Sequence, residues 1–148
     1  MNQYSVKIIR DIDSFCQIEK DWNYLYDRGS YSKFQLFSYN YNCIKSQSLF
    51  TLLLIDSHNR ILEIWPCVLN NGSLVFIDSI HSDFCDIISE YNGDFMLKFI
   101  MNNFEIKNIL FQNIKSNSKV YKLPNNFNNS ITYSTINYSV LSVSYTNN

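Results

Sequence analysis

The spacing of hydrophobic residues changes several times along this 148-residue chain, and each change marks an expected element. Residues 4–9 alternate weakly between apolar and polar positions, which predicts a first strand. Apolar residues then recur every three or four positions over 15–26, which predicts a helix capped by a preceding aspartate and ended at Gly29. The same spacing over 34–44 predicts a second helix.

A run of strands is expected next. Residues 49–55 are continuously apolar, which is typical of a strand buried on both faces. A second strand over 60–69 contains Pro66, which indicates an edge position or a β-bulge because proline lacks the N–H that a sheet requires. The pair Asn71-Gly72 favours a two-residue hairpin turn that leads into a third strand over 73–79.

The last third of the chain predicts helix, strand, short helix and strand. A helix from Gly93 to about Asn103 is expected to bury Phe95, Phe99 and Ile100, and residues 107–114 read as a strand. A helical turn over 118–123 and a linker-like segment over 125–130 follow. One long strand is then expected over 131–145, where the alternation slips between positions 140 and 141 as a β-bulge would cause. We expect one domain over 1–148, with a frayed tail at 146–148.

Composition and charge exclude several classes of protein. The chain is 46% hydrophobic and 17% charged, which is typical of globular proteins. The net charge is −1 and the basic residues are scattered, so we expect no nucleic-acid partner. The longest apolar run is far shorter than the roughly 20 residues of a membrane span. The N-terminus does not resemble a signal peptide, and the four cysteines form no CxxC pair, which predicts reduced thiols and a cytoplasmic location.

The stretch HSDFCDII, residues 81–88, places an imidazole, a thiol and two carboxylates close together. A metal site could use His81, Asp83 and Cys85, but no fourth ligand is evident, so we expect no metal. Cys85 is a poor candidate nucleophile because the neighbouring carboxylates would raise the pKa of its thiol. We expect a loop in which Asp83 and Asp86 bind backbone N–H groups and in which His81 and Asp86 lie near a ligand groove.

Several short motifs in this chain resemble those of one family. Its W-x-x-L motif corresponds here to Trp22 to Leu25, its F-Q-S-x-x-W motif to Phe34-Gln35 with Tyr39, and its apolar-x-P motif to Ile64 to Pro66. Its S-D-Y-x-D-F-I motif corresponds to Ser82 to Ile88, and its N-I-x-x-x-S motif to Gln112 to Ile114 with Ser116 or Ser118. The serine and tryptophan places of the second motif hold Leu36 and Tyr39 instead. The chain thus resembles the N-terminal half of the GNAT-type acetyltransferase-like proteins associated with cellulose and other surface polysaccharides, which are related to the Fem-type aminoacyl transferases.

This resemblance implies an α/β (α+β) fold with a mixed, mostly antiparallel sheet and helices on both faces. GNAT enzymes hold the CoA pyrophosphate at the helix after the fourth strand, in a glycine-rich loop that presents backbone N–H groups to the anion. Here residues 80–94 hold one glycine, Gly93, and four acids. Carboxylates would repel a pyrophosphate, so we expect no acetyl-CoA site in this chain, and the resemblance alone leaves its enzymatic activity open.

The leading hypothesis is a non-catalytic GNAT-like half that shapes an acceptor groove or partners a catalytic half. Candidate substrate-binding residues are Gln35, Trp65, His81, Asp83 and Asp86, although core packing also explains Trp65. No catalytic residue is assigned. The expected partners are a catalytic GNAT half or a second copy of the chain, with a small saccharide or amine as acceptor. Two alternatives stay open: a divergent acetyltransferase active as an oligomer, and a stand-alone protein-interaction module.

Overall fold

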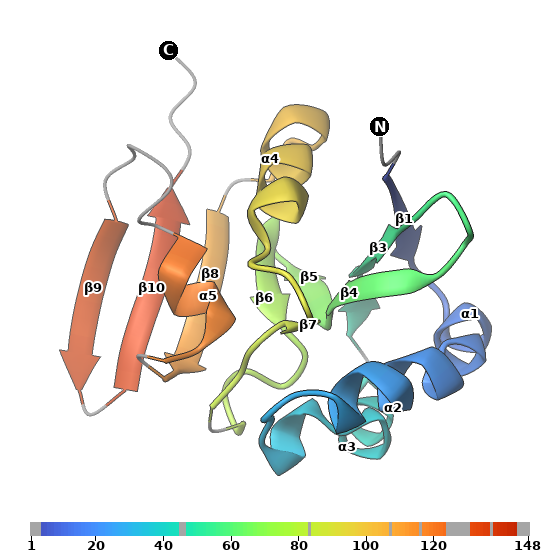
Figure 1. Ribbon diagram of the computed structural model, residues 1–148. Helices are drawn as coiled ribbons and strands as arrows, with labels where there is room; N and C mark the ends of the chain where they lie inside the picture. The colour runs from blue at the N-terminus through green and yellow to red at the C-terminus, as the bar shows by residue number, and fades with distance from the viewer. Residues whose placement is uncertain are drawn as a thin grey trace.

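The protein has an α+β fold with two β-sheets and several helices (Figure 1). The computed structural model describes residues 4–44, 47–82, 84–106, 108–115, 117–123, 131–136 and 138–144, with side chains up to residue 123. The elements in chain order are β1 (Ser5–Ile9), α1 (Ile12–Gln17), α2 (Glu19–Asp27), the 3-10 turn η1 (Lys33–Gln35), α3 (Phe37–Cys43), β2 (Ser48–Leu49), β3 (Thr51–Ile55), β4 (Ile61–Trp65), β5 (Cys67–Asn70), β6 (Ser73–Phe76), β7 (Ile88–Ser89), α4 (Asp94–Asn103), β8 (Asn108–Ile114), α5 (Lys119–Lys122), β9 (Ile131–Ile136) and β10 (Tyr138–Ser144).

The strand order confirms the predicted GNAT-like fold class. One sheet has the order β1-β3-β4-β7 and the other β2-β5-β6-β8-β10-β9. The pairs are antiparallel except β6 with β8, which are parallel and are joined by a crossover through α4. A meander of strands, then a helix, then a further strand is the element order that the sequence predicts, and the one parallel pair found among the described strands fits the expected mixed, mostly antiparallel sheet.

Pro66 divides one predicted strand between the two sheets. β4 ends before it and pairs with β3, whereas β5 begins after it and pairs with β6. Proline cannot donate a ladder hydrogen bond, but its carbonyl oxygen accepts one from the Ile77 N–H at 2.8 Å. The interruption predicted at Pro66 is therefore the place where the two sheets separate.

The predicted hairpin turn and the predicted last strand differ in outcome. Asn71 and Gly72 both have positive φ, 51° and 81°, as the predicted type I′ hairpin requires. The strand expected over 131–145 is instead the hairpin of β9 and β10. The predicted β-bulge is present nearby, because the register of β10 against β8 shifts between Ser139 and Leu141. The linker over 125–130 and the tail over 146–148 lie outside the described residues.

Two apolar clusters cover the two faces of β3, as predicted for a strand buried on both sides. Leu52 and Leu54 belong to the cluster that includes α4 and α5, whereas Leu53 belongs to the one that includes α1, α2 and α3. Figure 1 shows these three N-terminal helices grouped together, away from α4. Helices thus pack on both faces, as the sequence predicts. The prediction for α4 is correct for Ile100, which is buried, but Phe95 is 45% exposed and Phe99 only half-buried, and Met96 and Leu97 are buried in their place.

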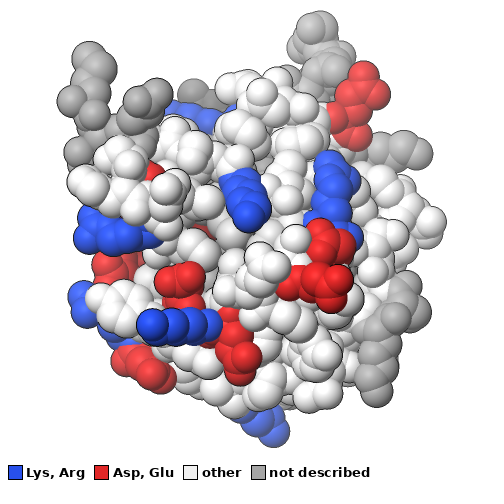
Figure 2. All heavy atoms as spheres, turned by 90° about the vertical axis from the view of Figure 1, so that its right-hand side faces the viewer, with Lys and Arg blue, Asp and Glu red and all other residues white. Residues whose placement is uncertain are grey.

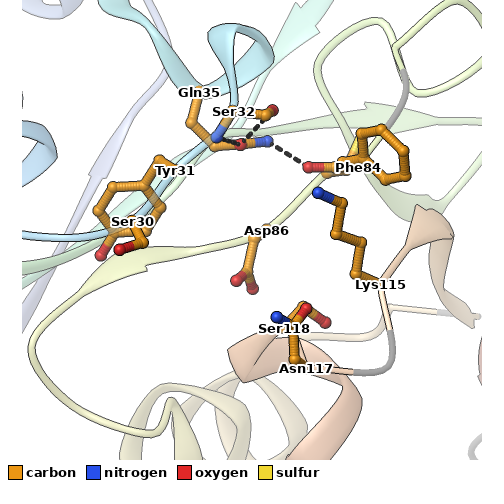
Figure 3. Close-up of a pocket in the computed structure, with 10 residues that line it drawn as sticks. Ser30, Tyr31, Ser32, Gln35, Phe84, Asp86, Lys115, Asn117 and Ser118 are labelled. Carbon is orange, nitrogen blue, oxygen red and sulfur yellow. Dashed lines mark hydrogen bonds between the residues drawn. The ribbon is translucent and has the colours of Figure 1, made fainter.

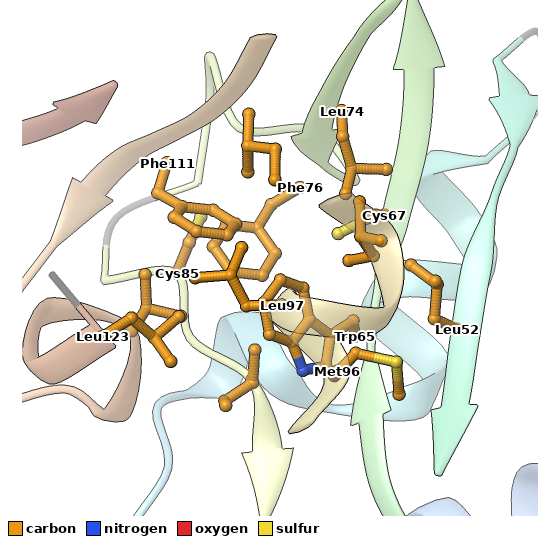
Figure 4. Packing of buried hydrophobic residues seen from close by; sticks show 14 of the residues in the cluster. Leu52, Trp65, Cys67, Leu74, Phe76, Cys85, Met96, Leu97, Phe111 and Leu123 are labelled. Carbon is orange, nitrogen blue, oxygen red and sulfur yellow. The ribbon is translucent and has the colours of Figure 1, made fainter. Parts of the chain in front are cut away.

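Aromatic rings fill the centre of each cluster. Trp65 and Phe76 both pack on Phe111, with ring centroids 5.5 and 5.0 Å apart (Figure 4). On the other face, Trp22 contacts the rings of Phe15 and Phe37. These bulky residues fix the positions of the loops that extend beyond them.

Basic and acidic side chains are mixed on the face that carries β1 and α1 (Figure 2). On this face, lysine and arginine are interspersed with aspartate and glutamate and form no continuous basic stripe. Within the described part of the chain, no helix has both the length and the apolar character needed to cross a bilayer.

Candidate functional site

Three loops that are distant in sequence enclose a pocket of about 350 Å³ (Figure 3). One loop joins α2 to η1, one lies within the stretch 81–88, and one joins β8 to α5. The lining residues are Ser30, Tyr31, Ser32, Gln35, Phe84, Cys85, Asp86, Lys115, Asn117 and Ser118. Two of the predicted site residues, Gln35 and Asp86, therefore line the same pocket. Its volume is near the lower end of the range for small-molecule sites.

Gln35 joins the first loop to the second. It is 3% exposed, and its Oε1 accepts hydrogen bonds from the backbone N–H and the hydroxyl of Ser32, at 3.0 and 2.6 Å. These contacts form a capping box at the start of η1. Its Nε2 donates to the carbonyl oxygen of Phe84 at 2.8 Å. The side chain thus fixes the distance between two walls of the pocket.

Phe84 has an uncommon backbone conformation at the edge of the pocket. Its φ is 61°, in the left-handed region that bulky residues rarely adopt. Burial of the ring does not compensate for this strained backbone, because the residue is 38% exposed. The Lys115 ammonium lies 3.9 Å from the ring centroid. Strained backbone concentrates at functional sites, where surrounding contacts hold it in place. The Gln35 hydrogen bond is one such contact.

Asp86 ties the second loop to the third. Its Oδ2 accepts the backbone N–H of Lys119 at 3.0 Å, and its Oδ1 accepts those of Val120 and Ile87 at 3.1 and 2.9 Å. The expected contact of Asp86 with backbone N–H groups is confirmed. Burial raises the pKa of the Asp86 carboxyl, although these three hydrogen bonds oppose the increase. The half-buried carboxylate therefore holds the start of α5 and faces the pocket.

The stretch 81–88 is held from the opposite side by the end of β8. The Asn113 side chain donates to the carbonyl oxygens of Ser79 and Ser82 at 2.8 and 3.0 Å, and its own carbonyl accepts the Cys85 N–H at 2.9 Å. Ser82, 1% exposed, also shares a 3.0 Å hydrogen bond with the Tyr39 hydroxyl. Thus Gln35, Tyr39, Asp86 and Asn113, which come from three of the motifs, meet around this one loop.

His81 lies in this loop but does not line the pocket. Its Nδ1 is 2.7 Å from Asp78 Oδ1, and its side chain is 77% exposed. The Tyr39 hydroxyl donates to the other oxygen of Asp78 at 3.0 Å. Asp83 lies outside the described residues. Among the residues that the structure describes, no group of three histidine, cysteine or acidic side chains could hold a metal ion, and Cys85 is buried in the core.

Trp65 is fully buried and lies in the core rather than in the pocket. Its Nε1 donates to the carboxylate of Glu63, which also accepts the Ser89 hydroxyl at 2.8 Å and lies near the backbone N–H of Gly93. Glu63 is 1% exposed, and burial raises the pKa of its carboxyl. Gly93 precedes the first residue of α4. The chain's own carboxylate therefore lies at the N-terminus of the crossover helix.

The start of α4 has a second internal acceptor. The Asp94 N–H donates to the Asn92 side-chain oxygen at 3.3 Å. Gly93 itself has φ of 80°, and a Cβ at this position would lie 2.9 Å from Ile87 Cδ1 and 3.1 Å from Leu123 Cδ2. The glycine is thus required by close packing against protein atoms.

Residues 85–89 cross the region beyond the parallel pair. Crevices where strands separate beside a crossover are frequent ligand sites in sheets with parallel strands. Here β6 pairs with β8 over Ser73–Val75, and the chain then turns away. The Cys85 N–H donates to the backbone carbonyl of Asn113 at the end of β8. Ile88 and Ser89 then form β7, which pairs with β4. Residues 85–89 therefore run between β8 and β4.

Sequence reasoning missed several lining residues. Tyr31 is held by β7, since its hydroxyl donates to the Ser89 carbonyl at 3.0 Å and accepts the Ser89 N–H at 2.9 Å. Lys115 directly follows β8, and its position at a strand end was the available signal, because residues there lie at the same edge as neighbouring loops. Ser118, which the motif Gln112 to Ile114 with Ser116 or Ser118 had indicated without a site role, caps α5 by accepting the Tyr121 N–H.

Comparison with known proteins gives little beyond the fold. No family model and no curated protein matches the chain. Among solved structures, a ribosomal-protein-S5-alanine acetyltransferase from Vibrio fischeri is similar, with 11% sequence identity and a TM-score of 0.49 over 97% of this chain and 96% of that chain. The fold assignment rests on the strand order described above and not on this likeness.

Proposed function

We propose that this chain is a GNAT-like domain that binds the acceptor of an acyl transfer and holds no acyl-CoA of its own. The observation that carries the proposal is the N-terminus of α4, where GNAT enzymes bind the CoA pyrophosphate. The buried Glu63 carboxylate already lies near the Gly93 N–H there, and the Asn92 side chain accepts the Asp94 N–H. A pyrophosphate at this position would compete with a buried carboxylate and would be repelled by it.

The path of residues 85–89 supports the same proposal. They run from β8 to β4 beside the parallel pair, and the pocket among the three loops is the candidate ligand site. The acceptor would bind in this pocket, and a catalytic GNAT half, on another chain or in a second copy, would bring the acyl donor. The resemblance of the motifs to the polysaccharide-associated family favours surface-polysaccharide or peptidoglycan-type acceptors, and the free cysteines among the described residues favour a cytoplasmic site of action.

Thermal denaturation with increasing acetyl-CoA tests the missing donor site. A ligand that binds only the folded state raises the midpoint by mass action, so we expect no rise here. A catalytically active GNAT enzyme serves as the positive control. A clear rise for this chain, or acetyl transfer by the purified chain alone, would overturn the proposal and favour a divergent acetyltransferase.

A further inference from the structure

Two side chains of opposite charge line the pocket. Asp86 comes from the second loop and Lys115 from the third. Figure 3 shows the Lys115 ammonium beside Phe84 and the Asp86 carboxylate turned toward α5. The ion pairs found among the described residues do not join these two groups. The Lys119 ammonium also attracts the Asp86 carboxylate, but these ion pairs include neither Asp86 nor Lys115, so both can contact a ligand that enters between them.

The Asp86 carboxylate keeps room for one more donor. A carboxylate has about four acceptor positions, two on each oxygen. Oδ1 accepts from Ile87 and Val120, while Oδ2 accepts from Lys119. A ligand ammonium could take the remaining position on Oδ2. Because Asp86 is half-buried, such a charge-assisted hydrogen bond is stronger than the same bond in open solvent.

Lys115 provides the opposite charge at the edge of the pocket. Its ammonium has three donors, and the Phe84 ring face takes up none of them as a conventional hydrogen bond. The 3.9 Å cation–π contact holds the ammonium near the opening. An anionic ligand group could bind there without displacing the lysine from the ring.

Polar groups form much of the remaining lining. Ser30, Ser32, Asn117 and Ser118 contribute hydroxyl and amide groups. A hydroxyl-rich ligand matches these groups, and the cavity of about 350 Å³ limits it to a small molecule.

We infer that the pocket binds a small hydroxyl-rich zwitterion, whose ammonium group is held by Asp86 and whose anionic group is held by Lys115. This inference rests on the acceptor role proposed above and names the chemical class of that acceptor. An amine next to Asp86 is also the kind of group that acyl transfer modifies.

Four polyols that differ in charge test the inference. D-Glucosaminate carries both charges, D-gluconate only the anion, D-glucamine only the cation, and sorbitol neither. Each is titrated into the ¹⁵N-labelled chain while the amide resonances of residues 84–86 and 117–119 are followed. We expect glucosaminate to bind about tenfold more tightly than gluconate or glucamine, since each loses one charge-assisted hydrogen bond.

Substitution of the lysine gives a second, independent readout. Lys115→Met should remove the advantage of glucosaminate over glucamine and leave the affinity for glucamine unchanged. Lys122→Met is the matched control, because Lys122 is exposed on α5 and does not line the pocket. Lys115 is also exposed, so its substitution should not affect folding.

The outcomes separate the two proposals. Equal binding of all four polyols, or an unchanged preference in Lys115→Met, would overturn the zwitterion inference but leave the acceptor role standing. No shift in the pocket resonances with any polyol would also overturn the inference. Binding of acetyl-CoA, measured separately, would instead overturn the proposed function.

Discussion

The Gln35 side chain and the Phe84 main chain, 49 residues apart in sequence, are joined by a 2.8 Å hydrogen bond from Nε2 to the carbonyl oxygen. This bond joins two of the three loops around the pocket. We expect Gln35→Ala to lower the free energy of unfolding by about 1–3 kcal/mol, because it leaves the partly buried groups of Ser32 and Phe84 without this partner. Urea denaturation measures the loss. Asn42→Ala is the control, since Asn42 is exposed and bonds the Ser38 carbonyl of its own helix. Equal losses in the two variants would contradict the linking role.

The strain at Phe84 predicts different stabilities for two small substitutions. Glycine adopts positive φ without a steric cost, so Phe84→Gly should be more stable than Phe84→Ala by about 1 kcal/mol. Both variants lose the ring that contacts Lys115, so both should bind the polyol ligand more weakly. Denaturation and ligand titration of the two proteins test this. If alanine were the more stable variant, the positive φ would not be a source of strain.

Asp86 should control the local stability of α5. Asp86→Asn replaces one acceptor oxygen with a donor, so the N–H groups of Lys119 and Val120 cannot both stay bonded as before. We expect a loss of about 1–2 kcal/mol and faster hydrogen exchange at these two amides. Asp27→Asn, at an exposed position, should change neither quantity. Unchanged exchange at Lys119 would argue against the tie between the loop and α5.

The buried Glu63 predicts a specific dependence of stability on pH. Because burial raises the pKa of this carboxyl above its ordinary value of 4.5, the folded state binds more protons than the unfolded state between the two pKa values. Its contribution to stability is therefore largest at low pH and falls as the pH rises through this window. Glu63→Gln keeps an acceptor for Trp65 and removes the titration.

The measurement for Glu63 is the free energy of unfolding across the acidic range. The difference between Glu63→Gln and the unchanged protein should grow in favour of glutamine as the pH rises. Asp86 has a pKa shifted in the same direction and stays present in both proteins, so its contribution cancels. A constant difference at all pH values would mean that Glu63 titrates normally.

Much of the fold followed from local pattern. The continuously apolar run in β3 and the Asn71-Gly72 turn both specify their structures through nearest neighbours, and both predictions are confirmed. The hairpin of β9 and β10 was missed because its alternation continues through the turn. Phe95 was misassigned because helical spacing fixes which residues share a face but does not tell how far the core extends beneath it.

The candidate site was only partly predictable. The motifs around Gln35, Asp86 and Asn113 indicated residues that belong together, and the structure brings them to one loop. The burial of Glu63 could not be predicted from the sequence, since a glutamate in an apolar strand normally suggests an exposed position. Its partners lie on a strand and a helix start that are distant in sequence, so only tertiary packing could reveal its place at the end of α4.

The pocket takes each wall from a different third of the polypeptide, which makes it one of the last features that a folding chain can complete. A bound small molecule would contact the three segments at once and hold them together. Its binding free energy would therefore add to the resistance of the entire protein to heat and proteolysis, and cells that supply such a molecule would retain more of the protein.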